Sequence, residues 1–150
     1  MHLRSRISSI VFFFLCSSGL LNAQASGHLS APSQVRPGHG MGVQLTIYPK
    51  GIQGPARYIQ EIPPQWHAGP LPVMSGELSV ESNQLRITWL NFPLKDSVKV
   101  AFELRIPEQE PIGQTFVLPG FLEYLEDGKL QRIPVDPLKV KTVRFYSRFQ

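Results

Sequence analysis

Residues 98–106 read VKVAFELRI, and this stretch decides the fold class of the chain. Every second position is apolar, and polar or small residues stand between. A strand places successive side chains on opposite faces, whereas a helix would scatter these apolar residues around its circumference. The stretch therefore predicts a β-strand with one buried face. That face consists of Val98, Val100, Phe102, Leu104 and Ile106.

The same alternation recurs on both sides of this stretch. Asp127-Gly128 between two apolar runs indicates a tight hairpin turn, because this pair supplies positive φ angles. Pro119-Gly120 is expected to break the chain between two strands, and residues 66–75 are expected to form an irregular loop. Further strands are predicted at residues 43–48, 56–62, 77–80, 85–89, 115–118, 121–125, 129–135 and 138–146.

The number of strands and the composition together predict the architecture. The 14 prolines among 150 residues argue against long helices, and 42% apolar residues suffice for one packed core. We therefore expect an all-β fold, an immunoglobulin-like antiparallel β-sandwich of about 7–9 strands, preceded by a signal peptide. A closed barrel is the alternative.

The N-terminus has the order of a secretory signal. Arg4 and Arg6 precede an uncharged, largely apolar run of about ten residues, which small and polar residues follow. The run is too short for a transmembrane anchor, which needs about 20 residues. Cys16 suggests a lipoprotein as another alternative, but lipidation requires a small residue where Leu15 stands. We expect a signal peptide at residues 1–25, cleaved after Ala23 or Ala25.

Cleavage would change the charge and the chemistry of the chain. Losing Arg4 and Arg6 reduces the 15 basic residues to 13 against 11 acidic ones, a net charge of +2 instead of +4. This near balance argues against nucleic acid as a partner. Cys16 is the single cysteine, so the mature chain would hold no disulfide and no thiolate metal site. It would also hold no transmembrane segment, and we expect it in the periplasm or outside the cell.

The mature chain divides into three parts by composition. Residues 26–42 are rich in Gly, Ser, Pro and His without periodicity, and are expected to form a flexible leader. Residues 43–146 carry the strands of the β-sandwich domain. Residues 147–150 remain as a short tail.

Catalytic and metal-binding patterns are missing from the sequence. His28, His39 and His67 have no i, i+2 or i, i+4 spacing to one another, and no nucleophile motif occurs. Adjacent acids such as Glu126 and Asp127 stand in a turn, where carboxylates are usually solvated. We therefore predict no catalytic residues, no metal, no cofactor and no enzymatic activity.

Aromatic residues provide the candidate binding site. Trp89 continues an alternating apolar series and is expected in the core. Trp66 follows Pro63-Pro64 beside His67, and with Tyr58 on the preceding strand it could form a platform on which a sugar or peptide stacks. We take Trp66, Tyr58 and His67 as candidate binding residues. The alternative is that Trp66 plugs one end of the sandwich.

The chain resembles bacterial secreted sandwich modules of the cohesin and repeated-adhesin type. The matching features are Gly51-Ile52-Gln53-Gly54, the strand into Ile62-Pro63-Pro64, Leu85 to Trp89 with its Leu-x-Ile-x-Trp pattern, and the long strand at 98–106. The resemblance covers about half of the chain. It implies a β-sandwich and a protein-binding role, since cohesins bind calcium-loaded dockerin partners. No partner-binding residues match, so none are carried over.

These observations lead to two functional hypotheses. The first is an exported, non-enzymatic interaction or structural module of the bacterial cell envelope, whose partner is another envelope or extracellular protein. It would act through loops or by pairing at a sheet edge, for which we expect the strands at 43–48 and 138–146. The alternative is a small carbohydrate-binding module that uses the loop aromatics on a glycan.

Overall fold

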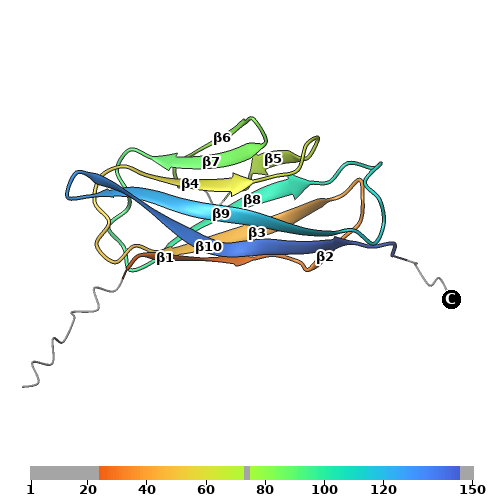
Figure 1. Ribbon diagram of the computed structural model, residues 1–150, viewed down its shortest axis with the longest axis horizontal. Coiled ribbons are helices and arrows are strands. Elements are labelled where there is room, and N and C mark those ends of the chain that lie inside the picture. The colour runs from red at the N-terminus through yellow and green to blue at the C-terminus, as the bar shows by residue number, and fades with distance from the viewer. Residues whose placement is uncertain (1–23, 73–74, 146–150) are drawn as a thin grey trace, which may run out of the picture.

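The computed structural model describes residues 24–72 and 75–145, and Figure 1 shows them as two layers of strands. Within these residues no helix is long and apolar enough to span a bilayer. The strands are β1 (Ser26–Ser30), β2 (Gln34–Val35), β3 (Gly40–Tyr48), β4 (Ala56–Glu61), β5 (His67–Pro70), β6 (Glu77–Glu81), β7 (Gln84–Trp89), β8 (Val98–Arg105), β9 (Thr115–Glu126) and β10 (Lys129–Thr142).

The strands form two sheets. The four-stranded sheet has the order β1-β3-β8-β5, and the six-stranded sheet has the order β2-β10-β9-β4-β7-β6. Every pairing is antiparallel except that of the two-residue strand β2 with β10. The prediction of an all-β sandwich is confirmed, with ten strands where about 7–9 were expected.

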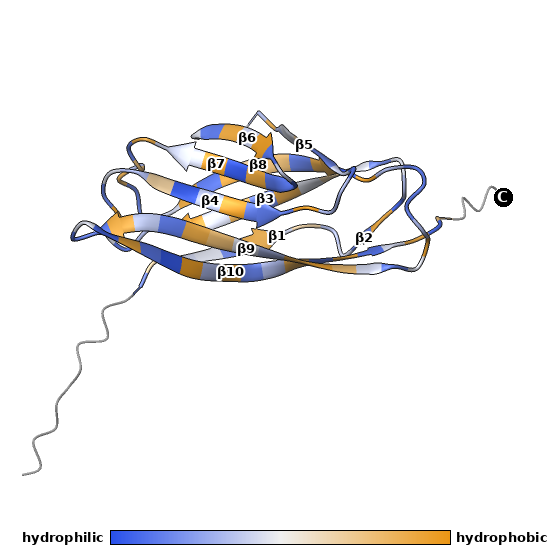
Figure 2. Cartoon of the chain, turned by 45° about the horizontal axis from the view of Figure 1, so that its top comes forward, coloured by the Kyte–Doolittle hydropathy of each residue, from blue (hydrophilic) through white to orange (hydrophobic). Residues whose placement is uncertain are grey.

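The core lies between the sheets and follows the alternation in the sequence. Along β8 the residues at even positions are buried, as the pattern at 98–106 predicts, and they face the inward residues of the other sheet. Figure 2 shows the same change from apolar to polar residues along the strands. Trp89 is buried against Phe92, with ring centroids 5.0 Å apart, so its predicted place in the core is confirmed.

The leader predicted at residues 26–42 is the first correction. This segment carries β1, β2 and the first residues of β3, so the sandwich begins at Ser26 and not at residue 43. Its alternation is hidden because β1 contributes only one large apolar side chain, Leu29. A Cβ atom at Gly27 would lie 2.8 Å from Val135 Cγ2, so the small residues allow β1 to pack closely on β10.

The break predicted at Pro119-Gly120 is wrong, because β9 runs through it. The buried Gln60 side chain donates hydrogen bonds to the carbonyls of Leu118 (3.1 Å) and Pro119 (3.0 Å), and its Oε1 accepts one from Tyr58 (2.6 Å). Gly120 leaves room for this network, since a Cβ atom there would lie 2.7 Å from Tyr58 Oη. A side-chain amide thus stabilises the strand where proline provides no N–H donor.

Three other strand predictions also need correction. The strands predicted at 129–135 and 138–146 are joined in one strand, β10, which ends at Thr142 and has a register shift between Val135 and Leu138. The loop predicted at 66–75 contains β5. The strands expected at sheet edges are interior, since β3 lies between β1 and β8, and β10 lies between β9 and β2. Periodicity reveals strands but not their neighbours, which is why the edges were misplaced.

Both termini fall outside these observations. The predicted signal peptide at residues 1–25 lies outside the described residues except for Gln24 and Ala25, and the predicted tail at 147–150 lies wholly outside them. The signal peptide, its cleavage site and the export of the chain stay predictions.

Candidate functional site

Tyr58 and Trp66 do not form the exposed platform that the sequence suggested. Tyr58 is fully buried on the inner face of β4, and burial raises the pKa of its hydroxyl. Trp66 is 4% exposed; its ring packs edge-on against Phe116 at 4.9 Å, and its indole N–H donates to Glu110 Oε2 at 3.0 Å. Trp66 therefore plugs one end of the sandwich, which was the alternative interpretation.

His67 is exposed and lines the first of two adjoining grooves at that same end. The groove next to His67 measures about 450 Å³ and shares Gly38 and Glu108 with a second groove of about 550 Å³. The second groove also carries Arg36, Arg144 and the half-exposed Phe145. Each groove carries both arginine and glutamate side chains, so the two grooves present a surface of mixed charge.

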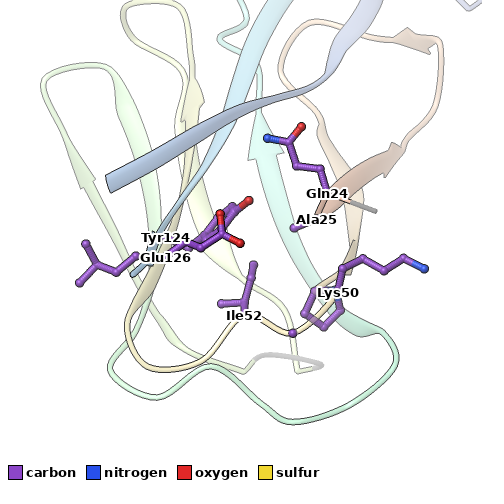
Figure 3. Close-up of a pocket in the computed structure, with 9 residues that line it drawn as sticks. Gln24, Ala25, Lys50, Ile52, Tyr124 and Glu126 are labelled. Carbon is purple, nitrogen blue, oxygen red and sulfur yellow. The ribbon is translucent and has the colours of Figure 1, made fainter. Parts of the chain in front are cut away.

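A smaller hollow of about 260 Å³ lies at the opposite end of the sandwich (Figure 3). Ile52 lies between Tyr124 and Lys50, and the Lys50 amino group points away from the hollow. Gln24 and Ala25 form part of its wall, at the point where the described chain begins. Among the described residues no group of three or more His, Cys, Asp or Glu side chains is placed to hold a metal ion.

Sheet edges are the other places where a protein of this fold can be approached, and three of the four are short or obstructed. β2 has two residues, and the four-residue strand β5 ends in Pro70. β1 packs against β10 through the contact of Gly27 with Val135. The fourth edge is β6, at the margin of the six-stranded sheet, which Figure 1 shows at the top.

The turn after β6 fixes which backbone groups point to the free edge. Ser82 and Asn83 form a two-residue turn with φ values of 50° and 60°, and Glu81 pairs with Gln84 across it. In such a hairpin the pair next to the turn is hydrogen-bonded, and bonded and non-bonded pairs alternate from there. The N–H and C=O groups of Leu78 and Val80 therefore point away from β7, where the described part of the chain provides no strand.

The side chains of β6 divide into two kinds. Leu78 and Val80 lie on the inner face, where Leu78 packs against the core and Val80 is 45% exposed. The outer face carries Ser79 between two carboxylates, Glu77 and Glu81. Glu81 forms an exposed ion pair of 2.8 Å with Arg86. β6 thus presents unpaired backbone groups, an apolar inner row and an acidic outer row.

The sequence alone contained part of this site. The turn at residues 81–83 and its flanking alternation predicted the hairpin correctly. That β6 has no second neighbour among the described residues depends on strand order, which no local pattern encodes. The signal that points to an edge is the pair of glutamates on a short strand, because charged residues are typical of edge strands.

Comparison with known proteins identifies the fold. No protein-family profile and no curated protein matches the chain. Its structure is similar to a non-cellulosomal cohesin from the hyperthermophilic archaeon Archaeoglobus fulgidus, with a TM-score of 0.57 and 15% identity over 81% of this chain and 93% of that chain. A GH20 exo β-N-acetylglucosaminidase from Vibrio harveyi has a TM-score of 0.50 and 12% identity, covering 84% of this chain but 20% of that chain.

The reeler domain of human F-spondin is also similar, with a TM-score of 0.48 and 11% identity over 85% of this chain and 99% of that chain. Identities this low show the fold alone and carry over no residue roles. The resemblance to cohesin modules seen in the sequence is confirmed at this level: the chain folds as a cohesin-like β-sandwich.

Proposed function

We propose that this protein is an exported, non-enzymatic interaction module of the bacterial cell envelope that binds a strand of a protein partner at the free edge of β6. One observation carries the proposal: the backbone groups of Leu78 and Val80 have no neighbouring strand within the described residues, although they belong to a six-stranded sheet. An added strand would satisfy these groups and cover Val80.

Two further features support a protein rather than a glycan as the partner. The cohesin-like fold is that of a module associated with protein binding. The aromatic rings on which a sugar would stack, Tyr58 and Trp66, are buried in the core. Export and location in the envelope rest on the N-terminal pattern of residues 1–25.

The test is site-specific photo-crosslinking in cells that express the protein. A photoreactive phenylalanine at Ser79, on the outer face of β6, should give an adduct of defined mass with a protein partner. The same residue at Gln44, exposed on the outer face of β3, provides the control position and should not give this adduct.

Two proline variants make this test specific for strand addition. The Val80 N–H points to the free edge, so Val80→Pro removes a donor for the partner and leaves the bonds to β7 intact. Ser79→Pro instead interrupts the ladder to β7 and should destabilise the hairpin. The proposal predicts loss of the adduct in folded Val80→Pro protein. An undiminished adduct in this variant, or an equal adduct from Gln44, would contradict it.

A further inference from the structure

We propose that the strand bound at β6 is the C-terminal segment 144–148 of a second copy of this chain. This inference rests on the proposed function and names its partner. The segment reads RFYSR, and β6 reads ELSVE. Paired in full register, the two sequences are complementary in charge and in apolar character.

The charges match at both ends of the pairing. Glu77 and Glu81 are four residues apart on the outer face of β6, and Arg144 and Arg148 have the same spacing. Each arginine therefore lies opposite a glutamate whether the added strand runs antiparallel or parallel. Opposite charges at directly facing positions stabilise a strand pair, and a shift of two residues would lose one of the two pairs.

The other face of the added strand matches the apolar row. Phe145 and Ser147 alternate with the arginines, so they lie on the side of Leu78 and Val80. In an antiparallel arrangement Phe145 lies opposite Val80, which is 45% exposed in the single chain. The pairing would bury two exposed side chains, since Phe145 is itself 57% exposed. Backbone groups of Phe145 and Ser147 then face the unpaired groups of Leu78 and Val80.

Distance requires that the segment come from another copy. Val143 N–H donates to Val35 O at 2.9 Å, which ties this residue to β2, at the other edge of the same sheet. From β10 to β6 there are four strand spacings of about 4.8 Å, so these two strands lie about 19 Å apart, and β2 lies one spacing further from β6. Arg144 directly follows Val143 and reaches less than about 4 Å further. It cannot pair with Glu77 or Glu81 of its own chain while β10 remains in place.

The positions of the two partners determine the type of assembly. β6 lies at one edge of the six-stranded sheet, and Val143, the residue before the segment, is bonded to β2 at the other edge. The contact joins two different surfaces, and each copy keeps one free edge and one free segment. Such heterologous contacts continue from copy to copy unless a ring closes.

Exchange of charges between the two surfaces tests the pairing. One variant carries Glu77→Arg and Glu81→Arg, and the other carries Arg144→Glu and Arg148→Glu. Each variant alone places like charges opposite each other, so its self-association in analytical ultracentrifugation should fall about tenfold or more relative to wild type. An equimolar mixture pairs opposite charges at every contact, and association should return.

A control variant distinguishes the pairing from a general charge effect. Lys139→Glu with Lys141→Glu makes the same charge change on exposed positions of β10, outside the segment, and should leave association unchanged. The inference is overturned if this control behaves like the Arg144→Glu, Arg148→Glu variant, if wild-type protein does not associate, or if the mixture remains monomeric.

Failure of this inference would leave the proposed function separately testable. If wild-type protein is monomeric but Ser79 still gives a crosslinked adduct that Val80→Pro abolishes, β6 binds a strand of a different protein. If neither association nor a Val80-dependent adduct occurs, both the inference and the proposed function are wrong.

Discussion

Backbone groups that lack a partner in the hydrogen-bond ladder occur both in the centre and at the margin of the six-stranded sheet, and the two regions differ in what can bind them. In the centre, Pro119 interrupts the ladder of β9, and the Gln60 side chain bonds the carbonyls of Leu118 and Pro119. At the margin, the backbone groups of Leu78 and Val80 have no neighbouring strand among the described residues. Inside the sheet, a side chain of the same chain thus binds the backbone groups beside the proline. At the edge, the backbone groups remain accessible to a strand of another chain.

This difference indicates that residues in the centre of the sheet contribute to stability and that residues of β6 contribute to binding. Buried polar groups without partners are costly, so the centre requires a specific side chain and a glycine of the right shape. At β6 the backbone groups of Leu78 and Val80 lie at the edge of the sheet, where water can satisfy them at little cost. Substitutions in the centre should therefore change the free energy of unfolding, and substitutions at β6 should change association.

The largest effect is expected for Gln60→Leu. This change removes the side-chain hydrogen bonds to the Leu118 and Pro119 carbonyls and to the buried Tyr58 hydroxyl, and should lower the free energy of unfolding by about 3 kcal/mol. Chemical denaturation measures it. Gln44→Leu, on an exposed face, is the matched control and should change the value by less than about 0.5 kcal/mol. Equal effects of the two changes would refute the role of Gln60.

Gly120→Ala should cost about 2 kcal/mol, because the added Cβ would lie 2.7 Å from Tyr58 Oη. Removing the hydroxyl with Tyr58→Phe should relieve part of this cost, so the double variant should be more stable than the sum of the single effects predicts. Gly42→Ala is the control, since its Cβ meets Leu71 at an ordinary 3.7 Å. Strictly additive effects of Gly120→Ala and Tyr58→Phe would contradict the close contact.

Val80→Pro tests β6, the edge strand of the sheet. The free energy of unfolding should fall by less than about 1 kcal/mol, because the lost N–H has no strand partner among the described residues. Self-association should nevertheless be lost. Denaturation and sedimentation of the same sample measure the two effects, and a loss of stability as large as that of Gln60→Leu would show that β6 is not an open edge.

The smallest effect on stability is expected for Glu81→Gln. Its ion pair with Arg86 is exposed, and removing it should cost less than about 0.5 kcal/mol. Association should weaken about threefold, because Glu81 would no longer face an arginine of the second copy. Glu103→Gln removes a similar ion pair on the other sheet and should leave association unchanged. Equal association of both variants would exclude Glu81 from the contact.

Strands and turns that depend on local alternation of apolar and polar residues can be predicted from the sequence. The stretch at 98–106, the hairpin around residues 81–83 and the turn at Asp127-Gly128 all lie where predicted. Features that depend on contacts between distant segments were missed. The alternation of β1 is hidden because its small residues suit the contact of Gly27 with Val135. Pro119-Gly120 indicates a break in the sequence because only the distant Gln60 explains how β9 continues through it.

The candidate site was missed for the same physical reason. Aromatic side chains near loops often bind ligands, which is why the sequence suggests Trp66 and Tyr58 as binding residues, but both are needed to fill the interior. The open edge at β6 follows from the order of strands in the sheet. Strand order is set by packing of the whole chain, so no window of sequence around Glu77 or Glu81 contains it.

Hydrogen exchange at individual amides of β6, followed by NMR as the protein concentration rises, tests the central claim most directly. In dilute protein the amides of Leu78 and Val80 should exchange fast, while those of Ser79 and Glu81, which face β7, exchange slowly. At high concentration Leu78 and Val80 should become protected together. Protection of both amides already in the dilute monomer, or fast exchange in fully associated protein, would contradict an open edge that accepts a strand.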